Sequence, residues 1–228
     1  MQRKRRFGAY LRLGSALGVA TDTMERGVTD RVLGIAGYGA DAAALVKQYE
    51  SISFGDVHRD VIHLFPERPS KILDIGAGSG RDAAALAQYG HHVVAVEPTA
   101  ELRDEGKRLH SSLAIEWVDD RLPALEFMRR TRQRFDLILL TAVWMHLDES
   151  ERKTAMRAIA DLVASGGQVI MSLRHGPVPK GRRMFDVSAD ETIELGAQFD
   201  LRAHHHSSRE DMLDRADVSW SFVALNRD

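Results

Sequence analysis

The chain has 228 residues, of which 44% are hydrophobic and 28% are charged, and its formal net charge is -2. This composition fits one globular α/β domain with a short extension, and it lacks the basic excess of proteins that bind nucleic acid or membrane surfaces. The absence of cysteine excludes disulfides, thiolate metal ligands and a cysteine nucleophile.

Residues 1–38 are interpreted as an N-terminal extension whose structure the pattern does not define, and residues 39–228 as one domain. The start, MQRKRRFGAYLRLGSALGVA, follows a basic cluster with apolar residues, as a secretory leader does. Arg12 interrupts the apolar stretch, so we favour an extension, with RKRR at 3–6 as a solvated tail. No stretch approaches the ~20 apolar residues of a membrane span, and we expect a cytoplasmic protein.

Two helices are predicted ahead of the main pattern. The first starts at Asp41 with the sequence DAAALVKQYE, and the second starts at Gly55 with the sequence GDVHRDVIHLF and ends before Pro66. The second has an apolar face at helical spacing, formed by Val57, Val61, Ile62, Leu64 and Phe65.

From Lys71 onward strand and helix patterns alternate, which indicates a parallel sheet covered by helices on both faces. The expected strands are Ile72–Ile75, Val93–Val96, Ala114–Val118, Phe135–Leu140 and Gln168–Leu173. The expected helices start near Arg81, Ala100, Pro123 and Asp148.

The helix after Asp148 has the clearest end signals. Asp148 is a candidate N-cap, Glu151 has the position of a capping-box partner, and Gly166 is expected to end the helix. The residues expected to face the sheet are Ala155, Ile159, Leu162 and Val163.

The C-terminal part begins with a loop, RHGPVPKGRRMF, of the length that lids and substrate loops have. A helix near Ala189–Phe199, a strand at Leu201–His205 and a last strand VSWSFVAL follow. The connection between these two strands leaves little room for a crossover helix, so we expect an antiparallel end to the sheet.

A glycine-rich turn follows the first of these strands. Gly76, Gly78 and Gly80 remove side chains at alternate positions, which lets backbone approach a ligand closely. Glu97 ends the second strand at the same edge of the sheet, where its carboxylate could accept both hydroxyls of a ribose. Together these features predict a ligand that contains adenosine.

NAD is one candidate for that ligand. Its fingerprint spaces small residues as G-x-G-x-x-G or A, whereas Arg81 occupies the third position here and the glycines run G-x-G-x-G. Asp74, two residues before the first glycine, suits a cationic ligand better.

The motif D-x-G-x-G-x-G beginning at Asp74 resembles the first motif of the class I S-adenosylmethionine-dependent methyltransferases. Three later stretches are similar to that family in the same order, namely WVDDRLPAL, FDLILLTAVWMHL and ASGGQVIMSL. The resemblance covers the chain from about Tyr49 to the C-terminus. It implies a Rossmann-like, doubly wound, seven-stranded α/β sheet that is mostly parallel, with an antiparallel last strand.

The resemblance also implies a set of cofactor contacts for S-adenosylmethionine. Asp74, Gly76 and Gly78 would hold its methionyl end, Glu97 its ribose, and Asp119, with Asp120 as the alternative, its adenine. Further cofactor-binding candidates are Tyr49, Ala77, Pro98 and Thr141. The turn has the GSGRD form seen in relatives that act on small thiols or metalloid oxyanions, and no contact is assigned to Asp82.

Candidate acceptor-side residues follow the fourth and fifth strands. His146 is a candidate base or substrate contact, with a loop histidine bonded to backbone as the alternative. Arg174 and His175 suit an anionic or polar substrate, with a solvated surface pair as the alternative. No metal site is expected, and the HHH run at 204–206 is interpreted as part of an exposed edge strand.

These patterns favour a methyltransferase that acts on a small molecule. The cysteine of cytosine-C5 methyltransferases is missing, and TAVWMHL lacks the Asn or Asp, Pro, Pro, aromatic signature of amino-group DNA methyltransferases. A non-catalytic protein that binds S-adenosylmethionine and an NAD-dependent oxidoreductase remain as alternatives. The patterns identify neither the acceptor nor the oligomeric state.

Overall fold

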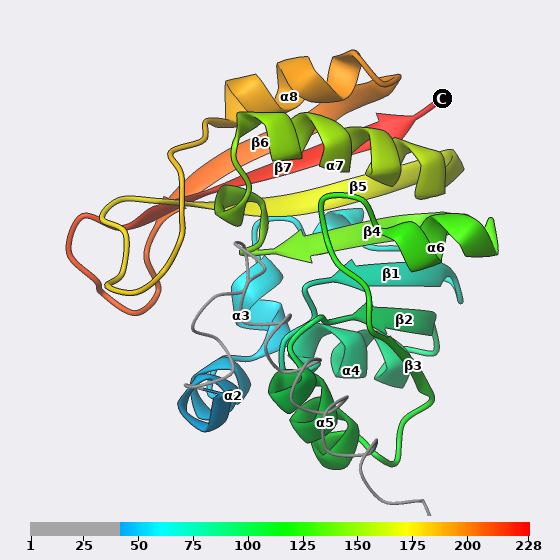
Figure 1. Cartoon of the computed structure of the whole chain (residues 1–228), viewed down its shortest axis with the longest axis vertical. Coiled ribbons are helices and arrows are strands. Elements are labelled where there is room, and N and C mark those ends of the chain that lie inside the picture. The colour runs from blue at the N-terminus through cyan, green and yellow to red at the C-terminus, as the bar shows by residue number, and fades with distance from the viewer. Residues whose placement is uncertain (1–41) are drawn as a thin grey trace, which may run out of the picture.

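A seven-stranded sheet forms the centre of the computed structural model, which describes residues 42–228 (Figure 1). The predicted extension at 1–38 and the predicted helix start at Asp41 lie outside the described residues. The strand order is β3-β2-β1-β4-β5-β7-β6. The strands are β1 (Lys71–Ile75), β2 (His92–Val96), β3 (Ile115–Val118), β4 (Phe135–Thr141), β5 (Val163–His175), β6 (Leu201–Glu210) and β7 (Ser219–Arg227).

The first five strands pair in parallel, whereas β7 lies between β5 and β6 and is antiparallel to both. The predicted fold is therefore confirmed, including its antiparallel end. The chain order reverses between β1 and β4, and in such sheets ligands bind at the carboxyl ends of the strands beside this point.

Helices cover both faces of the sheet (Figure 1). They are α2 (Ala42–Glu50), α3 (Phe54–His58), α4 (Arg81–Gln88), α5 (Ala100–Leu109), α6 (Glu126–Thr131), α7 (Glu149–Leu162) and α8 (Ala189–Ala197), with short 3₁₀ turns η1 (Ile62–Leu64) and η2 (Trp144–His146). On one face, β1 side chains such as Leu73 share a core with α6, α7 and α8. On the other face, Ile72 shares a core with α3 and α4.

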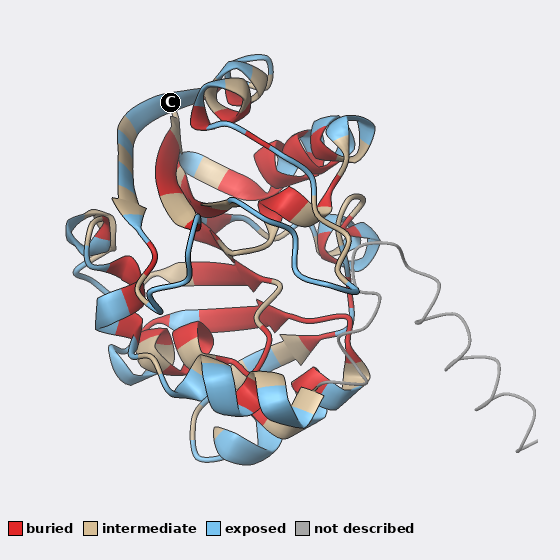
Figure 2. Ribbon diagram, turned by 90° about the vertical axis from the view of Figure 1, so that its left-hand side faces the viewer, coloured by how far each residue is buried: buried red, intermediate tan, exposed pale blue. Residues whose placement is uncertain are grey.

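Strand alternation explains these two cores, because successive side chains of a strand point to opposite faces. Figure 2 shows the central strands buried along most of their length, while the outer faces of the helices are exposed. The edge strand β6 is mostly exposed, as expected for the HHH run that it contains.

The N-terminal end of α7 matches its prediction. The Asp148 and Glu151 side chains form a reciprocal capping box with each other's backbone amides, at 2.9 and 2.8 Å. All four residues expected to face the sheet are buried, namely Ala155, Ile159, Leu162 and Val163.

Three predicted helix boundaries were wrong. The helix expected from Gly55 to Phe65 is split into α3 and η1, because Val61 has a non-helical φ of -124°, and Ile62 is 42% exposed. The helix expected from Pro123 begins at Glu126, since Leu125 has a positive φ of 46°. Gly166 does not end α7, which stops at Leu162.

Gly166 instead has a φ of +73° within β5, in a stretch where the pairing with β4 shifts register between Val163 and Gln168. β5 and β6 are also longer than predicted. Across residues 42–228, no helix combines the length and the apolar character that crossing a bilayer requires.

At Gly106, α5 packs tightly against the turn that follows β1 and contains Gly76, Gly78 and Gly80. A Cβ atom at this position would overlap the Trp117 ring and lie 2.7 Å from the Ser79 carbonyl oxygen. We therefore expect Gly106→Ala to lower the free energy of unfolding by about 1–3 kcal/mol through overpacking, although alanine favours a helix by ~1 kcal/mol. Urea denaturation measures this change.

Gly55→Ala is the matched control, because among residues 42–228 the nearest neighbour of a Cβ there is the Ser53 hydroxyl at 3.9 Å. It should leave stability unchanged or slightly raised. Equal stability of the two variants would contradict the packing described for Gly106.

Candidate active site

A cavity of about 550 Å³ opens at the carboxyl ends of the parallel strands. Its walls come from α2, the glycine turn after β1, the ends of β2, β4 and β5, the 176–188 loop and the loop between β6 and β7. Most of the predicted site residues line it, namely Tyr49, Asp74, Gly76, Ala77, Gly78, Glu97, Pro98, Asp120, Thr141, His146 and Arg174.

The glycine turn exposes backbone to this cavity. Gly76 and Gly78 have φ angles of +72° and +58°, a region that residues with a side chain rarely adopt. A Cβ at Gly76 would lie 2.5 Å from a methyl of Val143, and one at Gly78 would lie 3.3 Å from the Tyr49 ring. The conformation therefore favours glycine at both positions, and the space also requires it at Gly76.

Glu97 fastens this turn to the end of β2. One carboxylate oxygen accepts a hydrogen bond from the Gly78 amide and the other from the Thr99 amide, each at 2.8 Å. Burial raises the pKa of Glu97, and the two amide bonds oppose that rise. The Thr99 hydroxyl also hydrogen-bonds this carboxylate, which keeps one further lone pair for a ligand hydroxyl and gains a second if the Thr99 hydroxyl turns away.

Asp74, at the end of β1, is a buried acid that lacks a full set of partners. The Ala83 amide hydrogen-bonds its carboxylate, but among the described residues its Oδ2 atom has no hydrogen-bond partner. Burial and the nearby charge of Asp82 raise its pKa well above the usual range. A cationic donor in the cavity would satisfy this atom.

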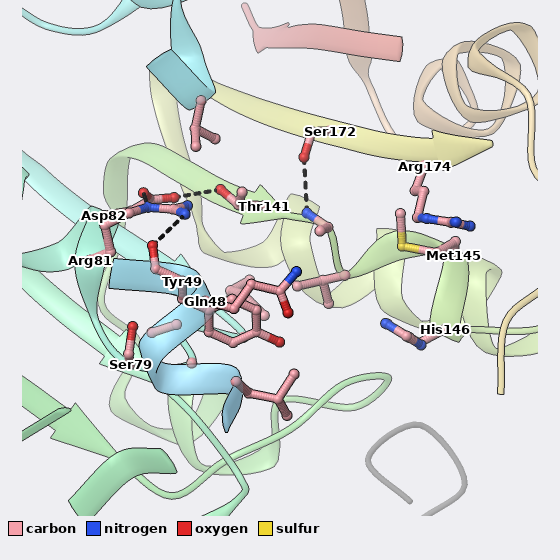
Figure 3. Close-up of a pocket in the computed structure, with 18 of the residues that line it drawn as sticks. Gln48, Tyr49, Ser79, Arg81, Asp82, Thr141, Met145, His146, Ser172 and Arg174 are labelled. Atoms are coloured by element: carbon pink, nitrogen blue, oxygen red, sulfur yellow. Dashed lines mark hydrogen bonds and ion pairs between the residues drawn. The ribbon is translucent and has the colours of Figure 1, made fainter. Parts of the chain in front are cut away.

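Asp82, in the first turn of α4, is the opposite case. Its carboxylate contacts His58 Nε2 at 2.9 Å and Arg81 Nε at 2.7 Å, and it accepts the Thr141 hydroxyl proton at 2.8 Å (Figure 3). Burial alone would raise its pKa, but His58 and Arg81 hold that pKa far below its usual range. Because donors within the protein already bond this carboxylate, Asp82 holds His58, Arg81 and Thr141 in place and does not offer a free acceptor to a ligand.

Of the two acids after β3, only Asp120 lines the cavity. Asp119, the favoured adenine contact in the sequence analysis, does not line it: its side chain is 62% exposed and pairs with Arg103. Asp120 is buried and accepts bonds from the Arg121 and Met128 amides, at 2.8 and 2.9 Å. The geometry thus favours Asp120.

His146 lies in η2, on the side of the cavity away from Arg81 and Asp82 (Figure 3). Its Nδ1 is 2.7 Å from the Arg183 carbonyl oxygen, which places the proton of the neutral ring on Nδ1 and leaves a lone pair on Nε2. Burial, opposed by this bond and aided by the charges of Arg182 and Arg183, lowers its pKa.

Arg183 anchors the 176–188 loop at this point. Its guanidinium donates to the His146 carbonyl at 2.8 Å and pairs with Glu151 at 2.7 Å and Asp148 at 3.0 Å. The loop is therefore tied to the N-terminus of α7 and to His146.

The two predicted residues at the end of β5, Arg174 and His175, have different surroundings. Arg174 lines the cavity, whereas His175 does not and contacts the Ser221 hydroxyl through Nε2 at 2.8 Å. Strand alternation turns neighbouring side chains to opposite faces. Within residues 42–228, no group of three or more His, Asp or Glu side chains is arranged to hold a metal ion.

The roles of His58, Asp82 and Arg183 were not predicted from the sequence. Asp82 had a usable signal, since it is an acid in the first turn of the helix that follows the glycine turn. His58 and Arg183 had none, because their partners lie far away in the sequence.

Comparisons with known proteins agree with this geometry. A family model described as "Methyltransferase domain" matches residues 72–167. A ubiquinone biosynthesis O-methyltransferase of Bartonella quintana is 30% identical over 115 residues, which are 50% of this chain and 45% of that protein. The chain thus spans about half the length of such relatives.

Solved structures share the fold at low sequence identity. A TehB-like SAM-dependent methyltransferase from Corynebacterium glutamicum has a TM-score of 0.62 at 19% identity, covering 83% of this chain and 99% of that chain. The N-methyltransferase NodS from Bradyrhizobium japonicum, in complex with S-adenosylhomocysteine, has a TM-score of 0.55 at 17% identity, covering 69% and 78%.

The contrast between Asp74 and Asp82 can be tested on the ligand-free protein. Because the pKa of Asp74 is raised, its ionisation opposes folding, and Asp74→Asn should raise the free energy of unfolding at neutral pH. This gain should vanish as the pH falls below the unfolded-state pKa of ~3.9.

Asp82→Asn should do the reverse, since its carboxylate pairs with His58 and Arg81. The expected loss is about 3–5 kcal/mol at neutral pH, and it should shrink as the pH falls from the unfolded-state pKa toward the lowered folded one. Urea denaturation at several pH values measures both. A destabilising Asp74→Asn would contradict the account of that carboxylate.

Proposed function

We propose that the protein is an S-adenosylmethionine-dependent methyltransferase that acts on a small-molecule acceptor. The observation that carries the proposal is the buried, unsatisfied carboxylate oxygen of Asp74 beside a side-chain-free turn. S-adenosylmethionine has an ammonium group and a sulfonium centre, so it suits an acid that lacks a partner. The match of residues 72–167 to a methyltransferase domain supports the same conclusion.

The cavity residues fit the parts of this cofactor. Asp74 and the backbone at Gly76–Gly78 would hold the methionyl end, and Glu97 would accept the ribose hydroxyls. Asp120 replaces Asp119 as the adenine contact in this proposal. The remaining contacts would come from Tyr49, Ala77, Pro98 and Thr141, which also line the cavity.

NAD fits the cavity less well. The turn is bordered by four acids, Asp74, Asp82, Glu97 and Asp120, all of which are buried. The anionic pyrophosphate of NAD would lie near these acids, and like-charge repulsion from those that are ionised would destabilise the complex. A cationic cofactor avoids that repulsion.

Bound S-adenosylmethionine supplies a methyl group on a positively charged sulfur, which is open to in-line displacement. The chain's contribution is to hold an acceptor nucleophile in line and to exclude water. The acceptor's lone pair forms the new bond to carbon, and the sulfur keeps the electron pair of the bond that breaks. A hydroxyl or ammonium acceptor must also lose a proton.

His146 Nε2 would take that proton. Its lone pair is defined by the bond from Nδ1 to the Arg183 carbonyl, and its lowered pKa keeps the ring neutral at physiological pH. We further propose that the protein is cytoplasmic, that its catalytic domain covers residues 39–228 and that its substrate is not a nucleic acid. We also propose that its glycine turn has the GSGRD form, in which Asp82 holds neighbouring side chains in place.

Calorimetry with S-adenosylmethionine, S-adenosylhomocysteine and NAD tests the proposal against its alternatives. We expect the first two to bind and NAD not to bind. Binding of NAD alone would favour an oxidoreductase. Binding of S-adenosylmethionine without methyl transfer to any of a panel of thiols, phenols, amines and carboxylates would favour a non-catalytic binder.

Glu97→Gln should weaken S-adenosylhomocysteine binding by about 1–3 kcal/mol. The amide side chain can offer only one oxygen, so its NH₂ group would face one of the two backbone amides that the carboxylate now accepts from. Glu105→Gln is the matched control, because Glu105 lies on α5, pairs with Arg108 and does not line the cavity. Equal affinities for both variants would remove Glu97 from the cofactor site.

His146→Gln should bind S-adenosylhomocysteine normally. Its rate of methyl transfer to a hydroxyl or ammonium acceptor should fall by ~10²–10⁴-fold. In the wild type the acid limb of the rate should lie below the ordinary histidine pKa of ~6.5, since a lowered pKa keeps the base neutral to lower pH. His92→Gln, at the exposed start of β2, is the control. Unchanged turnover in His146→Gln would refute the assignment.

A further inference from the structure

The cavity has opposite charge at its two ends. At its cofactor end, four buried acids from the ends of β1 and β2, the start of α4 and the residues after β3 outnumber the two cations, Arg81 and Arg121. At the other end, β5, β6 and the loops after them contribute the cations Arg174, Lys180, Arg182, Arg209 and Arg215, but only one acid, Asp211, among the described lining residues.

The Asp211 carboxylate already has hydrogen-bond partners within the protein. Arg215 forms two hydrogen bonds with the Asp211 carboxylate through Nε and Nη2, at 2.9 and 2.6 Å, and the Trp220 indole donates a third at 2.8 Å. Arg209 likewise pairs with Asp60 at 2.9 Å and donates to the Val57 carbonyl. These two arginines are therefore committed to partners within the protein.

Arg174 differs from them. Its Nη1 donates to the Pro177 carbonyl oxygen at 2.9 Å, while its Nε is buried and has no hydrogen-bond partner in the described part of the chain. Burial, together with the charge of Arg215, lowers the pKa of Arg174. The nearby Asp211 carboxylate offsets this cost of burial only in part, and Arg174 forms no ion pair with a carboxylate within residues 42–228.

The edge of a guanidinium formed by Nε and Nη2 matches the two oxygens of a carboxylate. Figure 3 shows Arg174, Met145 and His146 on the side of the cavity away from Arg81 and Asp82. An anion held there would be near the proposed base and away from the acids at the cofactor end.

The same end of the cavity also has many apolar side chains. Trp220 lies opposite Arg174 in the β5–β7 pairing, and the cavity is also lined by Met145, Met184, Met212, Leu213 and Phe222. Methionine side chains adapt to varied shapes, and aromatic rings bury large apolar surfaces. Such a wall suits the hydrocarbon or aromatic body of a ligand.

We propose that the methyl acceptor is a carboxylic acid with an apolar body, whose carboxylate pairs with the Nε edge of Arg174. This assignment rests on the proposed methyltransferase function and specifies its substrate class. The carboxylate is the recognised group, and a separate nucleophile on the same molecule faces His146.

Calorimetry on the full chain saturated with S-adenosylhomocysteine tests this assignment. The probes are 4-hydroxybenzoate, 4-mercaptobenzoate and 4-aminobenzoate, each paired with its neutral carboxamide. A charge-assisted bidentate contact predicts that the carboxylates bind at least about tenfold tighter than the carboxamides. Failure of S-adenosylhomocysteine itself to bind would overturn the proposed function, whereas normal cofactor binding without a carboxylate preference overturns only the acceptor class.

Variants of Arg174 provide the second arm. Arg174→Gln should abolish the carboxylate preference and leave S-adenosylhomocysteine affinity unchanged, and Arg174→Lys should keep part of it, as a point charge without the planar fork. Arg202→Gln, an exposed residue on β6 that pairs with Asp228, should keep the full preference. A preference that survives in Arg174→Gln, or no carboxylate binding to the wild type at millimolar concentration, would overturn the assignment.

Discussion

The bonds from the Gly78 and Thr99 amides to Glu97 join three parts of the site. They fasten the turn after β1 to the exit of β2 and to the start of α5. Because this carboxylate is buried, each bond forms where water does not compete for it. The turn is therefore held with its backbone toward the cavity, and Val143 and Tyr49 close around it where glycine leaves no side chain.

The arrangement of charge follows from the topology of the sheet. The exits of β1, β2 and β3 lie on one side of the point where the strand order reverses, and they carry the acids. β5, β7 and β6 lie on the other side, and the segments around them carry the arginines. One cavity thus has an excess of acids on one wall, despite Arg81 and Arg121, and an excess of cations on the other, despite Asp211, which suits a cationic cofactor next to an anionic acceptor.

Much of this structure could be predicted because patterns of nearby residues in the sequence determine it. The strands from β1 to β5 follow from the alternation of strand and helix patterns, the antiparallel end from the short connection between the last two strands, and the capping box at Asp148 from cap chemistry. The orientation of polar residues just beyond a strand could not, since a shift of one residue reverses the face. That explains why Asp120 and Arg174 line the cavity whereas Asp119 and His175 do not. His58 and Arg183 were missed because tertiary contacts alone give them roles.

A crystal structure of the full chain with S-adenosylhomocysteine tests the central claim most directly. The account predicts the ligand's ammonium group within hydrogen-bond distance of Asp74 Oδ2 and its ribose hydroxyls on Glu97, with the cavity around His146 and Arg174 left for an acceptor. An empty cavity at saturating ligand, or a ligand seated away from the glycine turn, would contradict it.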